Sequence, residues 1–191
     1  GKKITLTLLD SQDDTKSAFS MPAQLRSILS DSFFIRTTMI RRRSGIPRTV
    51  ETTYVWDGGR HLVLSGYPGK RDWVANMKAN PLLTVHTVEG ETCYDIQGKA
   101  RVLRDRDERT PLLLNFIEHW AKRPGYPRWQ FAIILGVLRA HRALRLPWWG
   151  PFAMARRTFD RMPCVEIELL GDPVERPGGP PPLSEPQMDS G

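Results

Sequence analysis

Hydrophobic and polar residues alternate along several short stretches of this chain, and alternation with a period of two is typical of β-strands. Asp57-Gly58-Gly59 is a strong hairpin turn, and Glu89-Gly90-Glu91 forms a second turn. Gly98 interrupts one stretch and is expected to mark a bulge or bend. Short antiparallel strands joined in this way fit a small closed barrel. The strands are expected at residues 33–42, 49–56, 61–65, 82–88, 92–103 and 164–170.

The N-terminal residues are expected to form a strand and a helix ahead of the barrel. Lys2 to Leu9 alternates as a short strand would. An apolar stripe with helical spacing then follows Ser20-Met21-Pro22, a sequence typical of a helix cap with proline in the first turn. The stripe consists of Leu25, Ile28 and Leu29, and we expect its helix to close one end of the barrel.

Residues 110–162 are expected to form a helical insertion before the last strand. Thr110 and Pro111 suit a helix start, and apolar residues then recur at the spacing i, i+3, i+4, i+7. A second helix is expected from about Arg128 to Leu146, followed by an aromatic sequence at 147–152. The two apolar stripes are Leu113, Phe116, Ile117 and Trp120, and then Phe131, Ile134, Leu135 and Leu138.

Three roles for the insertion stay open. It packs over the barrel and a dimer seam, or it forms a lid over an acceptor site, or it contacts a membrane surface through residues 128–159. Tryptophan and basic residues beside an apolar helix are typical of interfacial binding. We favour packing or a lid, because an amphipathic helix in a globular domain usually faces its own core.

The length of 191 residues fits one domain with a single core. We divide the chain into an N-terminal strand and helix (1–32), the barrel domain with its insertion (33–170) and a Pro/Gly-rich tail (171–191). The tail has little that could form a core, so we expect it to be disordered or loosely docked.

The formal net charge of +7 suggests a polyanionic partner. Nucleic acid, an anionic membrane surface and a phosphorylated, polyglutamylated cofactor all have the required charge. The sequence contains no zinc-finger spacing, recognition-helix motif or aromatic ribonucleoprotein signature, so we expect no nucleic acid partner.

Two cysteines, Cys93 and Cys164, make neither a disulfide framework nor a four-ligand zinc site. The four histidines fall on separate expected elements, so we expect no metal. No signal peptide opens the sequence, and its apolar runs are shorter than the ~20 residues that span a bilayer. We therefore expect a cytoplasmic location, with membrane association as the open alternative.

Arginines dominate the connection between the first two expected barrel strands. Arg41 to Arg43 and Arg48 surround the turn Ser44-Gly45-Ile46-Pro47. Guanidinium groups match phosphate and carboxylate oxygens with two parallel hydrogen bonds. This loop therefore predicts an anion-binding site.

A second loop, Ser65 to Arg71, carries two glycines that let the backbone approach a ligand closely. Asp72 can cap a helix that starts at Trp73, and the helix should end at Asn80, because a residue before proline is disfavoured in the α region. The N-terminus of this helix adds N–H donors for an anionic or electron-rich ligand. Together the two loops predict a cradle for an anionic cofactor.

Four pieces of the sequence occur in one order over about a quarter to a third of the chain. They are RRRSGIPRTV, YVWDGG, a Ser-Gly loop, and WVANMKANP followed by LLTVHTV. In this order they resemble the deazaflavin-dependent nitroreductase family, within the larger flavin and deazaflavin oxidoreductases built on the split β-barrel of pyridoxamine-phosphate oxidase. The resemblance implies an α+β fold, a six-stranded antiparallel split β-barrel with flanking helices, that forms a homodimer and binds the 8-hydroxy-5-deazaflavin coenzyme F-420.

The resemblance also assigns roles to residues around the two loops: residues 42–48 hold the phosphate and acidic tail, 49–53 line the ring, 64–67 contact its edge, and the short helix walls the site. No residue is required as a nucleophile or base, because the hydride chemistry belongs to the cofactor. Water, Tyr54 or Tyr67 is expected to supply any proton. The implied coenzyme-binding residues are Arg42, Arg43, Ser44, Arg48, Thr49, Val50, Thr52, Thr53, Leu64, Ser65, Gly66, Tyr67, Lys70, Trp73 and Asn76.

The implied activity is hydride transfer from reduced F-420 to a hydrophobic acceptor, such as a quinone, an enone or a nitroaromatic compound. The alternatives are an FMN-dependent oxidoreductase and a non-catalytic protein that binds flavin, deazaflavin or haem. The chain departs from the family pattern in the Ser-Gly loop, which lacks a lysine directly after the serine, is shorter before the tryptophan, and has Lys70 and Arg71 as replacement charges. Glu51 also stands where an uncharged residue is usual. The acceptor segment also has no clean match; the residues available are Tyr126, Trp148, Trp149, Phe152, Met154 and Phe159.

Overall fold

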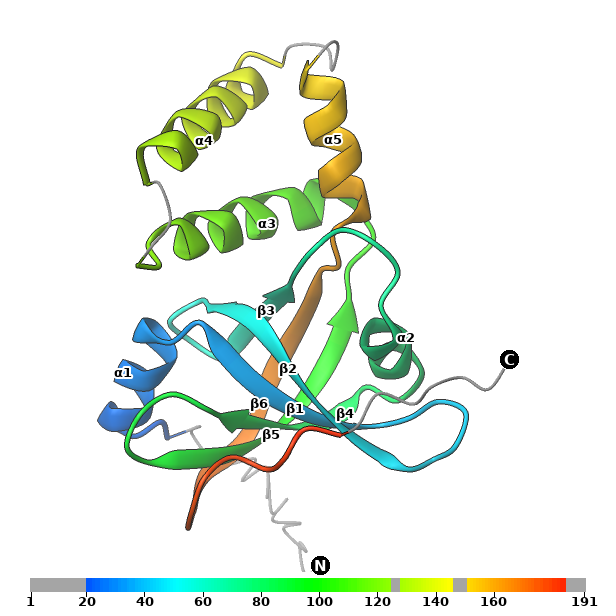
Figure 1. The fold of residues 1–191 in the computed structure, drawn as a ribbon, viewed down its shortest axis with the longest axis vertical. Coiled ribbons are helices and arrows are strands. Elements are labelled where there is room, and N and C mark those ends of the chain that lie inside the picture. Colours follow the sequence, from blue (N-terminus) through cyan, green and yellow to red (C-terminus); the bar gives the residue numbers. More distant parts are fainter. Residues whose placement is uncertain (1–19, 125–127, 146–150, 185–191) are drawn as a thin grey trace, which may run out of the picture.

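The structure is a computed structural model that describes residues 20–124, 128–145 and 151–184. In this part of the chain, six antiparallel strands form a closed barrel in the order β1-β2-β3-β6-β5-β4 (Figure 1). The α+β barrel with flanking helices and an insertion before the last strand is therefore confirmed. The strands are β1 (Phe34–Ile40), β2 (Pro47–Trp56), β3 (His61–Ser65), β4 (Leu82–Thr87), β5 (Cys93–Val102) and β6 (Val165–Arg176).

The main core fills the inside of the barrel. Inward-facing side chains of all six strands are buried there, among them Ile35, Leu64 and Ile96. On the opposite faces of β1, β2, β4 and β5 the side chains are largely polar. Alternation with a period of two thus separates an apolar interior from a polar outer surface.

Gly98 serves close packing and does not form the expected bulge. A Cβ at this position would lie 2.7 Å from Cγ2 of Ile167 on β6. The register shift occurs instead at the β5–β6 ladder between Asp95 and Gln97, where residues 171–173 of β6 lie opposite a single residue of β5. The bulge therefore belongs to β6.

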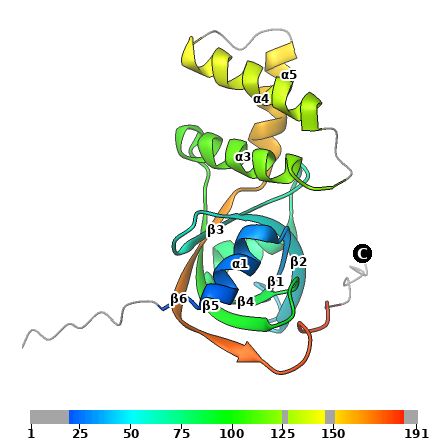
Figure 2. The ribbon, with the colours of Figure 1, turned by 90° about the vertical axis from the view of Figure 1, so that its left-hand side faces the viewer.

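Two helices close the two ends of the barrel. Helix α1 (Ala23–Asp31) lies across one end, as Figure 2 shows, and buries the predicted stripe against the barrel core. Helix α2 (Asp72–Ala79) packs Met77 into the core near the other end. The predicted caps differ in detail, since Pro22 is the N-cap of α1, and Arg71 is the N-cap of α2 with Asp72 in its first turn.

The described residues of the insertion between β5 and β6 form three helices: α3 (Arg106–Ala121), α4 (Arg128–Ala143) and α5 (Pro151–Arg161). Helix α3 lies next to the barrel and α4 lies beyond it (Figures 1 and 2). The backbone N–H of Leu103 donates to the carbonyl of Cys164 at 3.0 Å, so the insertion leaves and re-enters the barrel at neighbouring points. Of the described helices, none is long and apolar enough to cross a membrane.

The helix boundaries of the insertion differ from the prediction. Helix α3 begins five residues earlier, because the carboxylate of Asp105 accepts hydrogen bonds from the N–H groups of Asp107 and Glu108. Pro111 therefore lies inside the helix. Helix α5 was not predicted separately. In the second apolar stripe, Leu135 is buried. The structure does not describe the side chains of Phe131, Ile134 and Leu138, and it does not describe residues 125–127 and 146–150.

Strand β6 extends six residues beyond the predicted end, into the stretch expected to be a disordered or loosely docked tail. Residues 177–184 then lie along the outer face of the barrel. The N–H of Ser184 donates to the carbonyl of Thr49, and the Arg36 guanidinium donates to the carbonyl of Pro181. Residues 185–191 and the expected strand at Lys2 to Leu9 are outside the described residues.

Candidate functional site

The basic connection between β1 and β2 is a tight loop. The N–H of Gly45 donates to the carbonyl of Arg41, and Gly45 adopts a φ of +70°, in the left-handed region that favours glycine. The Ser44 hydroxyl accepts a hydrogen bond from the N–H of Ile46. Arg42 and Arg43 are in this turn, and Arg43 is exposed to solvent. Their guanidinium groups can therefore reach an external anion.

The loop is held against helix α2. The backbone N–H of Arg42 donates to Oδ1 of Asn76 at 3.2 Å, and Nδ2 of Asn80 donates to the carbonyl of Ile40 at 3.3 Å. The Arg42 guanidinium also lies 3.7 Å from the carboxylate of Asp72. Asn76 is buried, and its side chain therefore holds the arginine loop against α2. The sequence analysis assigned these two segments to one site.

Arg48 has an unusual environment at the start of β2. Among the residues that the structure describes, its Nε is buried and has no hydrogen-bond partner. A buried charged donor without an acceptor costs more free energy than a satisfied one. The arrangement therefore suits an anionic group that would accept from Arg48, as a phosphate or carboxylate does.

The loop at the end of β3, Ser65 to Arg71, is hydrogen-bonded mainly to the residues that connect the insertion to β6. The hydroxyl of Ser65 donates to the carbonyl of Pro163 at 2.7 Å, and the N–H of Gly69 donates to the carbonyl of Arg161 at 2.9 Å. Gly66, Tyr67 and Lys70 are more open to solvent, and Tyr67 is 80% exposed. This loop leads directly into α2, where Trp73 packs against the barrel core.

The strand residues proposed to line a ring lie on two faces of the sheet. Val50 and Thr52 are on the inward side of β2, together with Tyr54, and Leu64 is buried inside the barrel. Thr49 and Thr53 are on the outward side, where the Thr53 hydroxyl donates to the carbonyl of Ser65. A single ligand on the outer surface can therefore contact the side chains of the second group only.

Tyr54 is in the core and its phenol is not available to a ligand. The hydroxyl donates to the carbonyl of Leu29 at 3.0 Å, and burial raises the pKa of Tyr54 above its ordinary value. Of the two tyrosines expected to supply a proton, Tyr67 is the exposed one.

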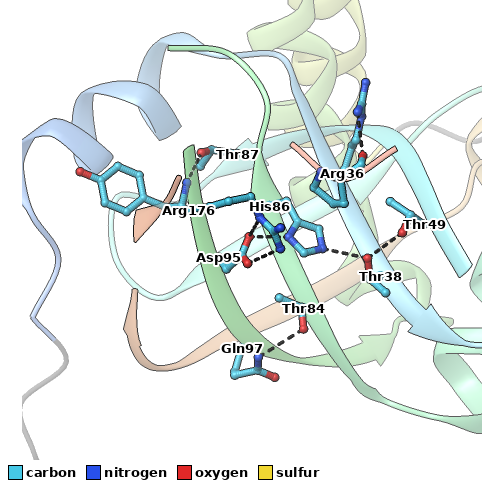
Figure 3. A network of polar contacts seen from close by, with 11 residues as sticks. Arg36, Thr38, Thr49, Thr84, His86, Thr87, Asp95, Gln97 and Arg176 are labelled. Atoms are coloured by element: carbon cyan, nitrogen blue, oxygen red, sulfur yellow. Dashed lines mark hydrogen bonds and ion pairs between the residues drawn. The ribbon is translucent and has the colours of Figure 1, made fainter. Parts of the chain in front are cut away.

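A row of polar side chains, of which the sequence predicted a role for Thr49 alone, crosses the outer face of β2, β1, β4 and β5 (Figure 3). The Thr49 and Thr38 hydroxyls are 2.8 Å apart, and the Thr38 hydroxyl is 2.8 Å from Nε2 of His86. Nδ1 of His86 is 2.6 Å from the carboxylate of Asp95, which the Arg176 guanidinium also contacts. We refer to these five residues as the outer polar row.

The outer polar row can hold and move a proton. A carboxylate accepts hydrogen bonds, so Asp95 places a proton on Nδ1 of His86 and leaves Nε2 to accept from or donate to Thr38. Burial raises the pKa of Asp95, but hydrogen bonds from Arg176 and His86 together lower it by more, so this pKa is below its ordinary value. His86 is 4% exposed, and its two ring nitrogens contact Thr38 and Asp95.

The row borders a cavity of about 570 Å³, a size in the range of small-ligand sites. Thr49 therefore belongs both to the predicted coenzyme-binding residues and to this cavity. No group of three or more His, Cys, Asp and Glu side chains in the described ranges could hold a metal ion. The cavity is lined by Thr38, Thr49, Thr84, His86, Asp95, Gln97, Asp172, Val174, Arg176 and Pro181.

Comparison with models of protein families finds a match over most of the described barrel. Residues 21–139 match the family model described as pyridoxamine 5'-phosphate oxidase. The chain belongs to this family. The match spans the barrel strands β1 to β5, both end helices, α3 and much of α4, so it includes both loops of the predicted cradle. No curated protein matches the chain.

Solved structures similar to this member of the pyridoxamine 5'-phosphate oxidase family share its fold at low identity. An F-420 reductase is 14% identical, covers 79% of this chain and 97% of its own, and superposes with a TM-score of 0.51. A 5-nitroimidazole antibiotic resistance protein from Bacteroides thetaiotaomicron is 11% identical, with coverages of 75% and 76% and a TM-score of 0.50. The haem storage protein HutZ from Vibrio cholerae is 11% identical, with coverages of 78% and 90% and a TM-score of 0.48.

Proposed function

We propose that this protein binds F-420 and passes a hydride from the reduced coenzyme to a hydrophobic acceptor such as a quinone, an enone or a nitroaromatic compound. The observation that carries the proposal is the buried, unpartnered Nε of Arg48, which is beside an arginine-rich loop fixed to α2. The family membership supports a flavin-type cofactor, and the sequence pattern around the loop favours the deazaflavin over FMN.

The residues present suit an anionic coenzyme. Arg42 and Arg43 are in the turn of the loop, Arg48 begins the following strand, and Lys70 adds an exposed charge from the second loop. Electrostatic attraction of this kind would hold the phosphate and the acidic tail. The outward Thr49 and Thr53 would then face the part of the coenzyme that lies along β2.

When bound, the coenzyme would supply the hydride, and the protein would orient it and exclude water. Thr49 connects the proposed site to His86 through Thr38, so a proton can reach the Thr49 hydroxyl from the outer polar row. The residues that we propose to line the acceptor site are still the aromatic residues and Met154 of the insertion given above. We also propose that the protein acts as a homodimer, as the sequence resemblance implies.

The test is a fluorescence titration of the purified protein with F-420, FMN and haem, followed by anaerobic mixing of the reduced coenzyme with menadione. Tight binding of F-420 and its reoxidation by the acceptor would support the proposal. Preference for FMN would assign an FMN-dependent oxidoreductase, and binding of any of the three without turnover would favour a carrier.

Replacing Arg48 with glutamine should weaken F-420 binding by about tenfold to a hundredfold at low salt, because a hydrogen bond to a charged group contributes roughly 1.5–3 kcal/mol. Arg43→Glu should also weaken binding, by an amount that decreases with added salt. Both dissociation constants are measured by the same fluorescence titration.

The matched control is Arg104→Gln, which removes one charge from an exposed arginine near the start of the insertion. Its affinity for F-420 should equal that of the wild type. Unchanged affinity in the Arg48 and Arg43 variants would remove this loop from consideration as the coenzyme site.

A further inference from the structure

Helix α4 exposes an apolar face on the side opposite its buried Leu135. Trp129 is 66% exposed, Ile133 57% and Leu144 68%, and Val137 between them is 47% exposed. Their spacing places them on one side of a helix with 3.6 residues per turn. On the other side of α4, Leu135 is buried. A helix that is apolar on both faces is usually covered on both.

This face is accessible from outside the molecule. Helix α3 lies between α4 and the barrel in both views, so α4 forms the end of the molecule farthest from the strands (Figures 1 and 2). On α5, Met154 is also exposed, at 73%. We call the four exposed side chains of α4, Trp129, Ile133, Val137 and Leu144, the α4 apolar face.

The same segment carries nearly all of the net positive charge of the protein. Residues 128–159 contain six arginines and no acidic residue, while the whole chain has a net charge of +7. The other 159 residues therefore sum to +1. Arg145 and Arg157 are exposed, whereas Arg139 pairs with Glu118 of α3. Positive charge is thus concentrated in the segment that carries the exposed apolar residues.

We propose that the α4 apolar face docks onto an anionic phospholipid bilayer, with α4 lying in the plane of the interface. Such a surface takes up apolar side chains and attracts arginines at the same time. Nucleic acid would use the charge but leave Ile133, Val137 and Leu144 in water. A second copy of this chain would cover the apolar residues but bring two positive segments together, which is unfavourable.

The experiment is co-sedimentation of the full-length protein with vesicles of phosphatidylcholine, with or without about one third phosphatidylglycerol. We expect sedimentation with the anionic vesicles only, and release when salt is raised to about 1 M, where charges more than about 3 Å apart are screened. Ile133→Ser combined with Val137→Ser should lower the partition coefficient by about tenfold or more, because apolar burial drives insertion.

The matched control is Leu82→Ser combined with Leu183→Ser, which removes two exposed apolar side chains elsewhere. It should bind as the wild type does, and circular dichroism should show both double variants folded. The proposal is overturned if neither vesicle sediments the protein, or if the two double variants bind equally. It is also overturned if light scattering shows a dimer that the Ile133 and Val137 changes dissociate.

Discussion

Asp95 joins groups from three strands on the outer face of the barrel. His86 of β4 and Arg176 at the end of β6 both contact its carboxylate, and Thr38 of β1 follows through the histidine. The native pKa of Asp95 is below the ordinary value of 3.8. Its charged form therefore stabilises the folded state above that pH, and the contribution is lost as the pH falls through the lowered native pKa.

Asp95→Asn should reduce the free energy of unfolding at pH 7 by roughly 1–3 kcal/mol, because it leaves Arg176 and His86 without a charged acceptor. The difference between wild type and variant should shrink as the pH falls below 3.8. Urea unfolding at several pH values measures this difference. Asp107→Asn, which changes an exposed carboxylate, is the control. If the stability difference between wild type and Asp95→Asn did not vary with pH, the stabilising role of the charged Asp95 would be contradicted.

Individual site residues were predictable to different degrees. The tight arginine loop between β1 and β2 follows local sequence signals. The partners of His86 could not be found in this way, because Thr38 comes from another strand and Arg176 from a stretch expected to be a tail. Tyr54 was misjudged, since a polar tip does not show whether a strand residue faces inward.

Strand and helix signals were reliable where one periodicity dominates. The boundaries of β1 to β5 follow alternation and turn chemistry closely. Strand β6 was cut short because the Pro/Gly-rich stretch from Gly171 has little that could form a core, although residues 171–173 form a bulge within a continuing strand. Helix α3 was started late because Pro111 suits a first turn, whereas Asp105 caps the helix earlier.

Gly98→Ala tests the close approach of β5 and β6. The new methyl group would overlap Ile167, so we expect a loss of roughly 1–3 kcal/mol in the free energy of unfolding. Gly136→Ala in α4 should act in the opposite direction and stabilise by about 0.5–1 kcal/mol, because the helix interior there has open space. Denaturant unfolding measures both, and equal stability of the Gly98 variant and wild type would contradict the packing.

At the scale of the whole molecule, the barrel and the insertion have separate cores. The main core contains no residue between 104 and 163 in the described part of the chain. Helices α3 and α5 contribute to a smaller cluster around Val63, Leu103 and Cys164 outside the barrel. The barrel therefore does not depend on the insertion for its interior.

Replacing residues 104–163 with an Asn-Gly turn should leave a folded barrel, because Leu103 and Cys164 already pair as hairpin neighbours. We expect a cooperative thermal transition at a lower Tm, since Val63 would lose its cover. Circular dichroism during heating measures this. Loss of the cooperative transition would show that the insertion is required for folding.

The position of β6 in the barrel has a consequence for biosynthesis. This strand is inserted between β3 and β5, yet it is the last to leave the ribosome. Until it emerges, β3 and β5 each present an unpaired edge, and unpaired edges of this kind promote association between chains. A nascent chain that stalls within the insertion would be exposed to aggregation for as long as β6 is missing.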